Sequence, residues 1–170
     1  MIRISTVTPV YNGSKYLDIL VKAIDGYRNM LIKNGAPFEI VESIFVLDGP
    51  IDNSSEILSK LKEEYSFINI LELSQNFGQH PATIAGILHT SGDWIATLDE
   101  DLQHEPKYIS DFLKKAVSDS SDICYARNPK STHRSFVRDR LSILYKKLKF
   151  WVARDDQVRD SEPNFISQVP

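Results

Sequence analysis

The chain has 170 residues, of which 42% are hydrophobic and 25% charged, the composition of one globular domain with a buried core. Its net charge of −3 argues against a nucleic-acid partner, and its single cysteine, Cys124, indicates a reducing compartment. No apolar run reaches the roughly 18 residues of a spanning helix, and no charged leader precedes the first apolar run. We therefore expect neither a signal peptide nor a membrane span, and a cytoplasmic location.

Apolar, β-branched runs alternate with segments of helical periodicity through the first half of the chain. Strands are predicted at 2–10, 40–47 and 68–73. A helix between the first two strands would be capped by Ser14 and would end near Asn34-Gly35. A second helix would begin at 52–54, where three residues that favour helix caps follow one another.

The second half of the chain continues this alternation. One helix is expected to begin at Pro81, which suits a first helical position, and to stop at Gly92. Another helix should begin at Pro106. The remaining predicted elements are strands at 94–98 and 122–126 and a basic helix at 136–152. No element is assigned to the polar tail, 155–170.

Strands separated by helices predict an α/β fold, with a mostly parallel central sheet and helices on both of its faces. Ligands of such sheets bind outside the carboxyl ends of the strands. The residues expected at those ends are Tyr11-Asn12-Gly13, Asp48-Gly49, the loop 75–80, Asp99-Glu100-Asp101 and Arg127. The predicted topology therefore gathers polar side chains at one edge of the sheet.

The acidic loop after the fourth predicted strand carries the strongest chemical signal. Asp99 and Asp101 flank one residue, and carboxylates so close repel one another unless a cation lies between them. Mg²⁺ commonly joins one or two carboxylates to substrate phosphates, and Gln103 offers a further oxygen. An acidic turn that favours the N-terminus of the following helix explains the same residues equally well.

Two further loops have weaker signals. Asp48 could accept hydrogen bonds from a base or ribose, although a turn at Asp48-Gly49 with Asp52 as a helix cap is the more common reason for this pattern. Gly78 permits close backbone approach to a ligand, whereas His80 is expected to be a solvated side chain. The sequence has no Cys/His metal spacing, no glycine-rich phosphate loop and no nucleophile elbow.

Positive charge is concentrated near the end of the chain. Between Arg134 and Arg154 there are seven arginines and lysines and one aspartate, in a segment with apolar residues at helical spacing. Such a basic amphipathic helix suits an anionic surface, so peripheral membrane contact is expected. The alternative is a solvated helix that packs its apolar face on the core.

Three segments, in this order, resemble glycosyltransferase family 2, whose nucleotide-sugar-binding fold is called GT-A. They are Thr8-Pro9-Val10-Tyr11-Asn12, the segment 46–54 and Asp99-Glu100-Asp101. The segments 73–80 and 97–106 look most like the polyprenyl-phosphate branch, which includes dolichyl-phosphate mannose synthase. The resemblance runs from about residue 4 to 150.

The resemblance implies roles for individual residues. Pro9, Tyr11 and Asn12 would line the nucleotide pocket, Asp48 would hold the base, and Asp99 and Glu100 would face the ribose or the diphosphate. Asp101 with Gln103 would bind Mg²⁺ or Mn²⁺, which makes Asp99 and Asp101 the catalytic pair. Arg127 would meet the donor phosphates, and Arg138 would bind the acceptor phosphate.

The chain also departs from the family pattern. Gly13 stands where the family often has an acidic residue, and Leu47-Asp48 replaces a pair of aspartates. Family members normally continue past the position of Pro170 with more of the acceptor half. We therefore expect a fragment of a longer chain, with a GT-A domain at 1–154 and a polar tail at 155–170.

The function that the resemblance implies is inverting, metal-dependent transfer of a sugar from a UDP- or GDP-sugar to a polyprenyl phosphate. Such an acceptor would place the protein at the inner face of the membrane. Transfer to a saccharide hydroxyl in polysaccharide or lipid-linked oligosaccharide synthesis is the alternative, and it requires a general base that the sequence does not identify. A non-catalytic nucleotide-sugar-binding module is a further alternative.

Overall fold

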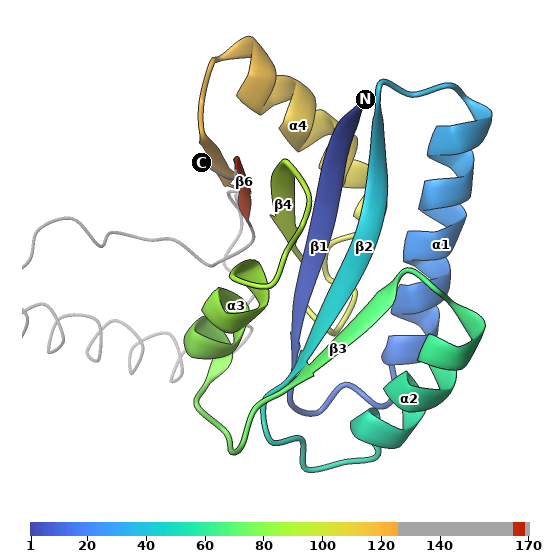
Figure 1. The fold of residues 1–170 in the computed structure, drawn as a ribbon, viewed down its shortest axis with the longest axis vertical. Helices are drawn as coiled ribbons and strands as arrows, with labels where there is room; N and C mark the ends of the chain where they lie inside the picture. Colours follow the sequence, from blue (N-terminus) through green and yellow to red (C-terminus); the bar gives the residue numbers. More distant parts are fainter. Residues whose placement is uncertain (126–164, 169–170) are drawn as a thin grey trace, which may run out of the picture. The chain divides into compact units, whose positions relative to one another are not determined.

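A six-stranded sheet organises the part of the chain that the computed structural model describes, residues 1–125 and 165–168. The strands are β1 (Ile2–Val10), β2 (Phe38–Leu47), β3 (Ile68–Glu72), β4 (Trp94–Thr97), β5 (Ile123–Tyr125) and β6 (Phe165–Gln168). Their spatial order is β3-β2-β1-β4-β6-β5, and β1 to β4 are parallel (Figure 1). The structure therefore confirms the predicted mostly parallel α/β sheet.

Strand β6 is the main feature that the sequence analysis did not assign. It lies within the tail 155–170 and runs antiparallel to both of its neighbours, β4 and β5. Ala96 and Cys124 both pair with Ile166, so β6 separates the fourth and fifth strands of the chain. A strand of four residues that pairs with segments so far away in sequence leaves little local signal.

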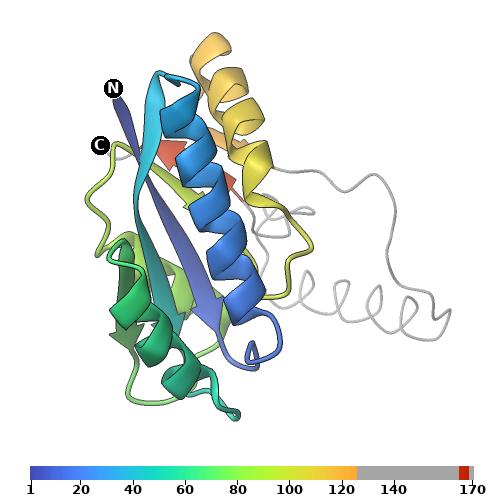
Figure 2. The same ribbon diagram turned by 90° about the vertical axis from the view of Figure 1, so that its right-hand side faces the viewer.

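Helices cover both faces of the sheet, as predicted. Their bounds are α1 (Leu17–Lys33), α2 (Ser54–Glu64), α3 (Gln79–Ile87), the 3-10 turn η1 (Pro106–Tyr108) and α4 (Ile109–Ser118). Helices α1, α2 and α4 close the larger core, and α3 closes a smaller one against β1 and β2 (Figures 1 and 2). Among these described helices, none has both the length and the apolar character needed to cross a bilayer.

Three predicted helix ends were wrong, each for a local reason. Ser14 does not cap α1, because the helix begins at Leu17 with Tyr16 at the cap position, and the Ser14 N–H donates to Asp52. Helix α3 begins before Pro81, which is its third residue, and ends at Ile87 rather than at Gly92. Gly92 serves a different purpose: a Cβ there would lie 2.7 Å from the backbone nitrogen of Ser5, so only glycine fits against β1.

A bulge in β2 lets both halves of that strand face the larger core. Ile4 pairs with Ile40 but Ser5 pairs with Glu42, so one extra residue sits in β2. The extra residue reverses the alternation of side chains, and Phe38 and Phe45 therefore pack in the same core.

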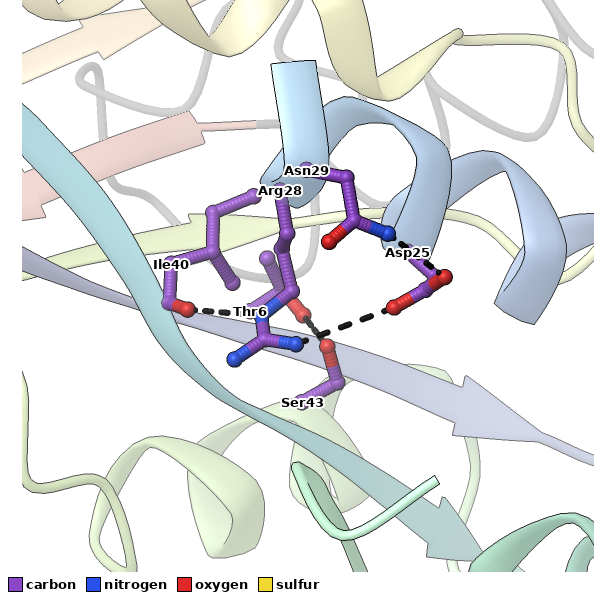
Figure 3. Close-up of polar contacts among 6 residues, drawn as sticks. All are labelled: Thr6, Asp25, Arg28, Asn29, Ile40 and Ser43. Atoms are coloured by element: carbon purple, nitrogen blue, oxygen red, sulfur yellow. Dashed lines mark hydrogen bonds and ion pairs between the residues drawn. The ribbon is translucent and has the colours of Figure 1, made fainter. Parts of the chain in front are cut away.

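Helix α1 binds the bulge through Arg28. The Nε atom of Arg28 donates to the carbonyl of Ile40 over 2.8 Å (Figure 3). The guanidinium carbon of Arg28 lies 4.2 Å from the centre of the Phe67 ring. In the same view, the hydroxyl of Thr6 in β1 donates to the hydroxyl of Ser43 in β2. Burial lowers the pKa of Arg28, and the nearby Asp25 and Glu39 carboxylates oppose that shift. These contacts fix the register of β1 and β2 before the strands reach their carboxyl ends.

Candidate nucleotide-binding edge

The loops that follow β1, β2, β3 and β4 meet at the carboxyl edge of the parallel strands. Strand β1 runs downward from the N-terminus in Figure 1, so this edge lies at the lower side of the view. Backbone bonds hold the loops together: Asp48 N–H donates to Val10 and Ile51 N–H donates to Tyr11. The residues predicted at this edge are therefore close together, apart from Arg127, which lies outside the described residues.

Glu100 joins the acidic loop to the loop after β1. Its Oε2 accepts the N–H of Tyr11 over 3.0 Å, and its Oε1 accepts the N–H of Asn12 over 3.2 Å. Burial raises the pKa of Glu100, the two backbone N–H groups lower it, and the neighbouring Asp52 and Asp101 carboxylates raise it further. The pKa of Glu100 therefore lies above its usual value, with burial as the largest cause.

Asp52 joins the loop after β2 to the loop after β1. One carboxylate oxygen accepts the Ser14 N–H over 2.9 Å, and the other accepts the N–H and hydroxyl of Ser54 at the start of α2. Partial burial acts to raise the pKa of Asp52, but the hydrogen bonds from Ser54 and Ser14 outweigh it and hold that pKa below its usual value. Asp52 therefore does bond the start of α2, as its sequence position indicated.

Asp48 joins the loop after β2 to the loop after β3. Its side chain is only 3% exposed, and its two oxygens accept the N–H groups of Phe77 and Gly78 over 2.7 and 2.8 Å. Gly49 has a φ of +58°, and a Cβ there would lie 2.7 Å from the nitrogen of Asn76. Asp48 thus holds the loop that precedes α3, and Gly49 leaves room for the backbone of that loop. The contact of Asp48 with a base stays a prediction.

Gln79 joins the loop after β3 to the acidic loop. Its side-chain amide donates to Asp99 Oδ1 over 3.0 Å. On the other side of Asp99, the Nδ1 of His104 lies 3.9 Å from Oδ2. With the bonds of Glu100, Asp52 and Asp48, this contact completes a closed ring of four loops. Gln79, the first residue of α3, was not among the predicted site residues. It directly follows Gly78, which was predicted to let a ligand approach the backbone closely.

The structure places Asp101 and Gln103, which were predicted to hold a divalent cation, side by side. The Gln103 backbone N–H and side-chain amide donate to the two oxygens of Asp101, over 3.1 and 2.6 Å, and both side chains are partly or fully exposed. Within residues 1–125 and 165–168, no three His, Cys, Asp or Glu side chains converge to hold a metal. A carboxylate and an amide oxygen fit Mg²⁺ or Mn²⁺, which take few protein ligands when phosphates supply the rest.

The remaining predicted residues divide into two groups. Pro9 is partly buried in β1, whereas Tyr11 is 42% exposed and Asn12 is also exposed, beside the acidic loop. Arg127 and Arg138, with the rest of the basic segment 134–154, lie outside the described residues. The edge described here is therefore acidic, and its predicted phosphate-binding arginines are not among its described contacts.

Comparisons with known proteins identify the family of this chain. The family model described as "Glycosyl transferase family 2" matches residues 5–168. The chain belongs to glycosyl transferase family 2. An undecaprenyl-phosphate 4-deoxy-4-formamido-L-arabinose transferase of Yersinia enterocolitica is 42% identical over 108 residues, which is 63% of this chain and 31% of that protein. A bactoprenol glucosyl transferase of Shigella phage SfX is 29% identical over 144 residues, 85% of this chain and 45% of that protein.

A solved structure shows the same fold. A mannosyltransferase from Pyrobaculum calidifontis, in complex with GDP-Man and Mn²⁺, matches with a TM-score of 0.59 and 16% identity, over 84% of this chain and 38% of that one. This chain spans less than half the length of each of these three proteins.

Proposed function

We propose that this chain is the nucleotide-sugar-binding part of an inverting glycosyltransferase, which uses Mg²⁺ or Mn²⁺ and transfers a sugar to a polyprenyl phosphate. The observation that carries the proposal is the closed ring of loops at the carboxyl edge. It brings the predicted nucleotide residues Tyr11 and Asn12 against the acidic loop through Glu100. The names of two relatives, which specify undecaprenyl phosphate and bactoprenol, support this acceptor class.

The residues of the ring would divide the work of binding. Tyr11 and Asn12 would line the nucleotide, while Asp48 would hold the loop at Phe77 and Gly78 and meet the base. Asp101 and Gln103 would hold the cation, and Asp99, fixed by Gln79, would face the ribose or the diphosphate. When bound, the cation would neutralise the leaving nucleoside diphosphate. A phosphate acceptor is already anionic, so the chain need not supply a general base.

Calorimetry with UDP and GDP, each with Mn²⁺ and with EDTA, tests the proposal. We expect measurable binding of one nucleotide with Mn²⁺ and at least about tenfold weaker binding in EDTA, because unscreened carboxylates repel the diphosphate. Asp101→Ala should remove the Mn²⁺ dependence. Asp111→Ala, at an exposed position of α4, is the matched control and should behave as the parent chain. Equal affinity of the parent with Mn²⁺ and in EDTA would overturn the role of the metal.

A further inference from the structure

The carboxylate of Glu100 points toward the loop after β1 and contacts the backbone of that loop. Both of its oxygens are engaged by backbone N–H groups, those of Tyr11 and Asn12. Its side chain is half-buried, whereas Tyr11 is 42% exposed. A carboxylate that accepts two successive N–H groups fixes the direction of the backbone between them.

Gly13 provides the space that this carboxylate fills. A Cβ at position 13 would lie 2.6 Å from Glu100 Oε2 but 3.4 Å from Glu100 Cβ. Gly13 does not have a positive φ, so its backbone conformation does not require glycine. Any side chain at position 13 would therefore push away the end of Glu100 and not its base.

The charge of Glu100 and its hydrogen bonds have opposite effects on an anionic ligand. Asp52 and Asp101 are acidic neighbours of Glu100, so several carboxylates share this edge. By charge alone, Glu100 would weaken the binding of a nucleoside diphosphate. By its hydrogen bonds, it would strengthen binding if the nucleotide requires a fixed Tyr11-Asn12 loop. The sign of the effect of removing Glu100 therefore separates the two roles.

We propose that Glu100 is a positioning residue, which holds the Tyr11-Asn12 loop in the conformation that binds the nucleotide. Gly13 makes this possible because it has no side chain to displace the Glu100 carboxylate. The ligand part of this inference rests on the proposed function. The loop part depends only on the contacts between Glu100 and the backbone.

Amide hydrogen exchange of the full chain tests the loop part without any ligand. In Glu100→Ala, the N–H groups of Tyr11 and Asn12 should exchange about tenfold faster than in the parent chain. Gly13→Ala should produce the same increase, and the double variant should exchange no faster than Glu100→Ala. Gly26→Ala, at a helical position with no atom within 4 Å of the added Cβ, is the control and should leave both amides unchanged. Unchanged exchange in Glu100→Ala would overturn the inference.

Calorimetry with UDP or GDP and Mn²⁺ tests the ligand part. Glu100→Ala and Gly13→Ala should each weaken binding about tenfold, and the double variant should be no weaker than Glu100→Ala, because the two changes break the same contact. Glu63→Ala, at an exposed position of α2, is the control for the loss of one carboxylate. Tighter or unchanged binding in Glu100→Ala would overturn the positioning role. No binding by the parent chain would instead overturn the proposed function, and the exchange data would still decide the loop part.

Discussion

Two glutamates of this chain, Glu42 and Glu100, accept several hydrogen bonds each but differ in the direction of their pKa shift. Glu42 lies at the bulge of β2 and accepts the Ser5 hydroxyl, the Ser91 N–H and hydroxyl, and the Asn69 amide. Burial acts to raise the pKa of Glu42, but these bonds outweigh it and lower that pKa. The pKa of Glu100 is raised, because burial and its acidic neighbours outweigh two bonds.

The opposite pKa shifts of Glu42 and Glu100 show that a glutamate carboxylate has different surroundings at the β2 bulge and at the carboxyl edge. Around Glu42, hydroxyl and amide donors surround one carboxylate, and its charge stabilises the fold. At the carboxyl edge, burial raises the pKa of Glu100, and the neighbouring Asp52 and Asp101 carboxylates raise it further. In the proposed function, a cation held by Asp101 and Gln103 would offset part of this negative charge. We therefore expect Glu42 to serve the fold, and we propose the carboxyl edge as the place where the ligand binds.

Asp48→Ala should have the largest effect on stability. The carboxylate is 3% exposed and accepts two N–H groups, and its removal leaves both donors without this acceptor. The free energy of unfolding should fall by about 2–4 kcal/mol. If Asp48 also meets the base, nucleotide binding should weaken by about 1.5–3 kcal/mol. Urea denaturation and calorimetry measure the two effects. Unchanged affinity in a folded variant would restrict Asp48 to holding the loop.

Glu42→Ala should have a smaller effect, and on stability alone. Glu42 is only partly buried, so water can replace some of its partners, and the free energy of unfolding should fall by about 1–2 kcal/mol. Nucleotide affinity should not change, because Glu42 bonds Ser5, Ser91 and Asn69 rather than the loops of the carboxyl edge. Loss of nucleotide binding in a folded Glu42→Ala variant would remove the contrast between the two regions.

The pH dependence of the Glu42 contribution is the smallest expected effect. Because the folded pKa of Glu42 lies below its usual value of 4.5, its stabilising contribution is present above about pH 4.5 and is lost as the pH falls through the folded pKa. Glutamine does not titrate, so the stability difference between the parent chain and Glu42→Gln should shrink between about pH 6 and pH 3. Urea denaturation at several pH values measures it. A difference that grows toward low pH would contradict the assigned shift.

Much of the fold could be predicted because its signals are local. The apolar runs of β1 to β4 and the polar residues just after them were visible in the sequence, and the parallel topology followed from the helices between them. Strand β6 could not be predicted, because its four residues gain their structure from pairing with β4 and β5. The end of α3 was predicted wrongly because Gly92 packs closely on Ser5 and does not stop the helix, which ends at Ile87.

The candidate site could be located from the sequence, but the contacts of its residues could not. Asp48, Asp99 and Glu100 were predicted to face ligands, and the structure shows each of them also bonded to a neighbouring loop. Such bonds join residues 20 to 89 positions apart, and no local pattern reveals them. Gly13 was visible only as a departure from the family pattern, and its purpose became clear beside Glu100.

The contrast between the region around Glu42 and the carboxyl edge is tested most directly by a melting experiment. The measurement is the rise in melting temperature when Mn²⁺ is added with whichever nucleotide, UDP or GDP, the parent chain binds. A ligand that binds the folded state raises its stability. Three chains are compared: the parent, Glu42→Ala and Asp101→Ala. We predict that Glu42→Ala melts lower without ligand but gains as much as the parent. Asp101→Ala should melt near the parent without ligand and gain little. A full gain in Asp101→Ala would contradict the assignment of the carboxyl edge to a metal-dependent nucleotide site.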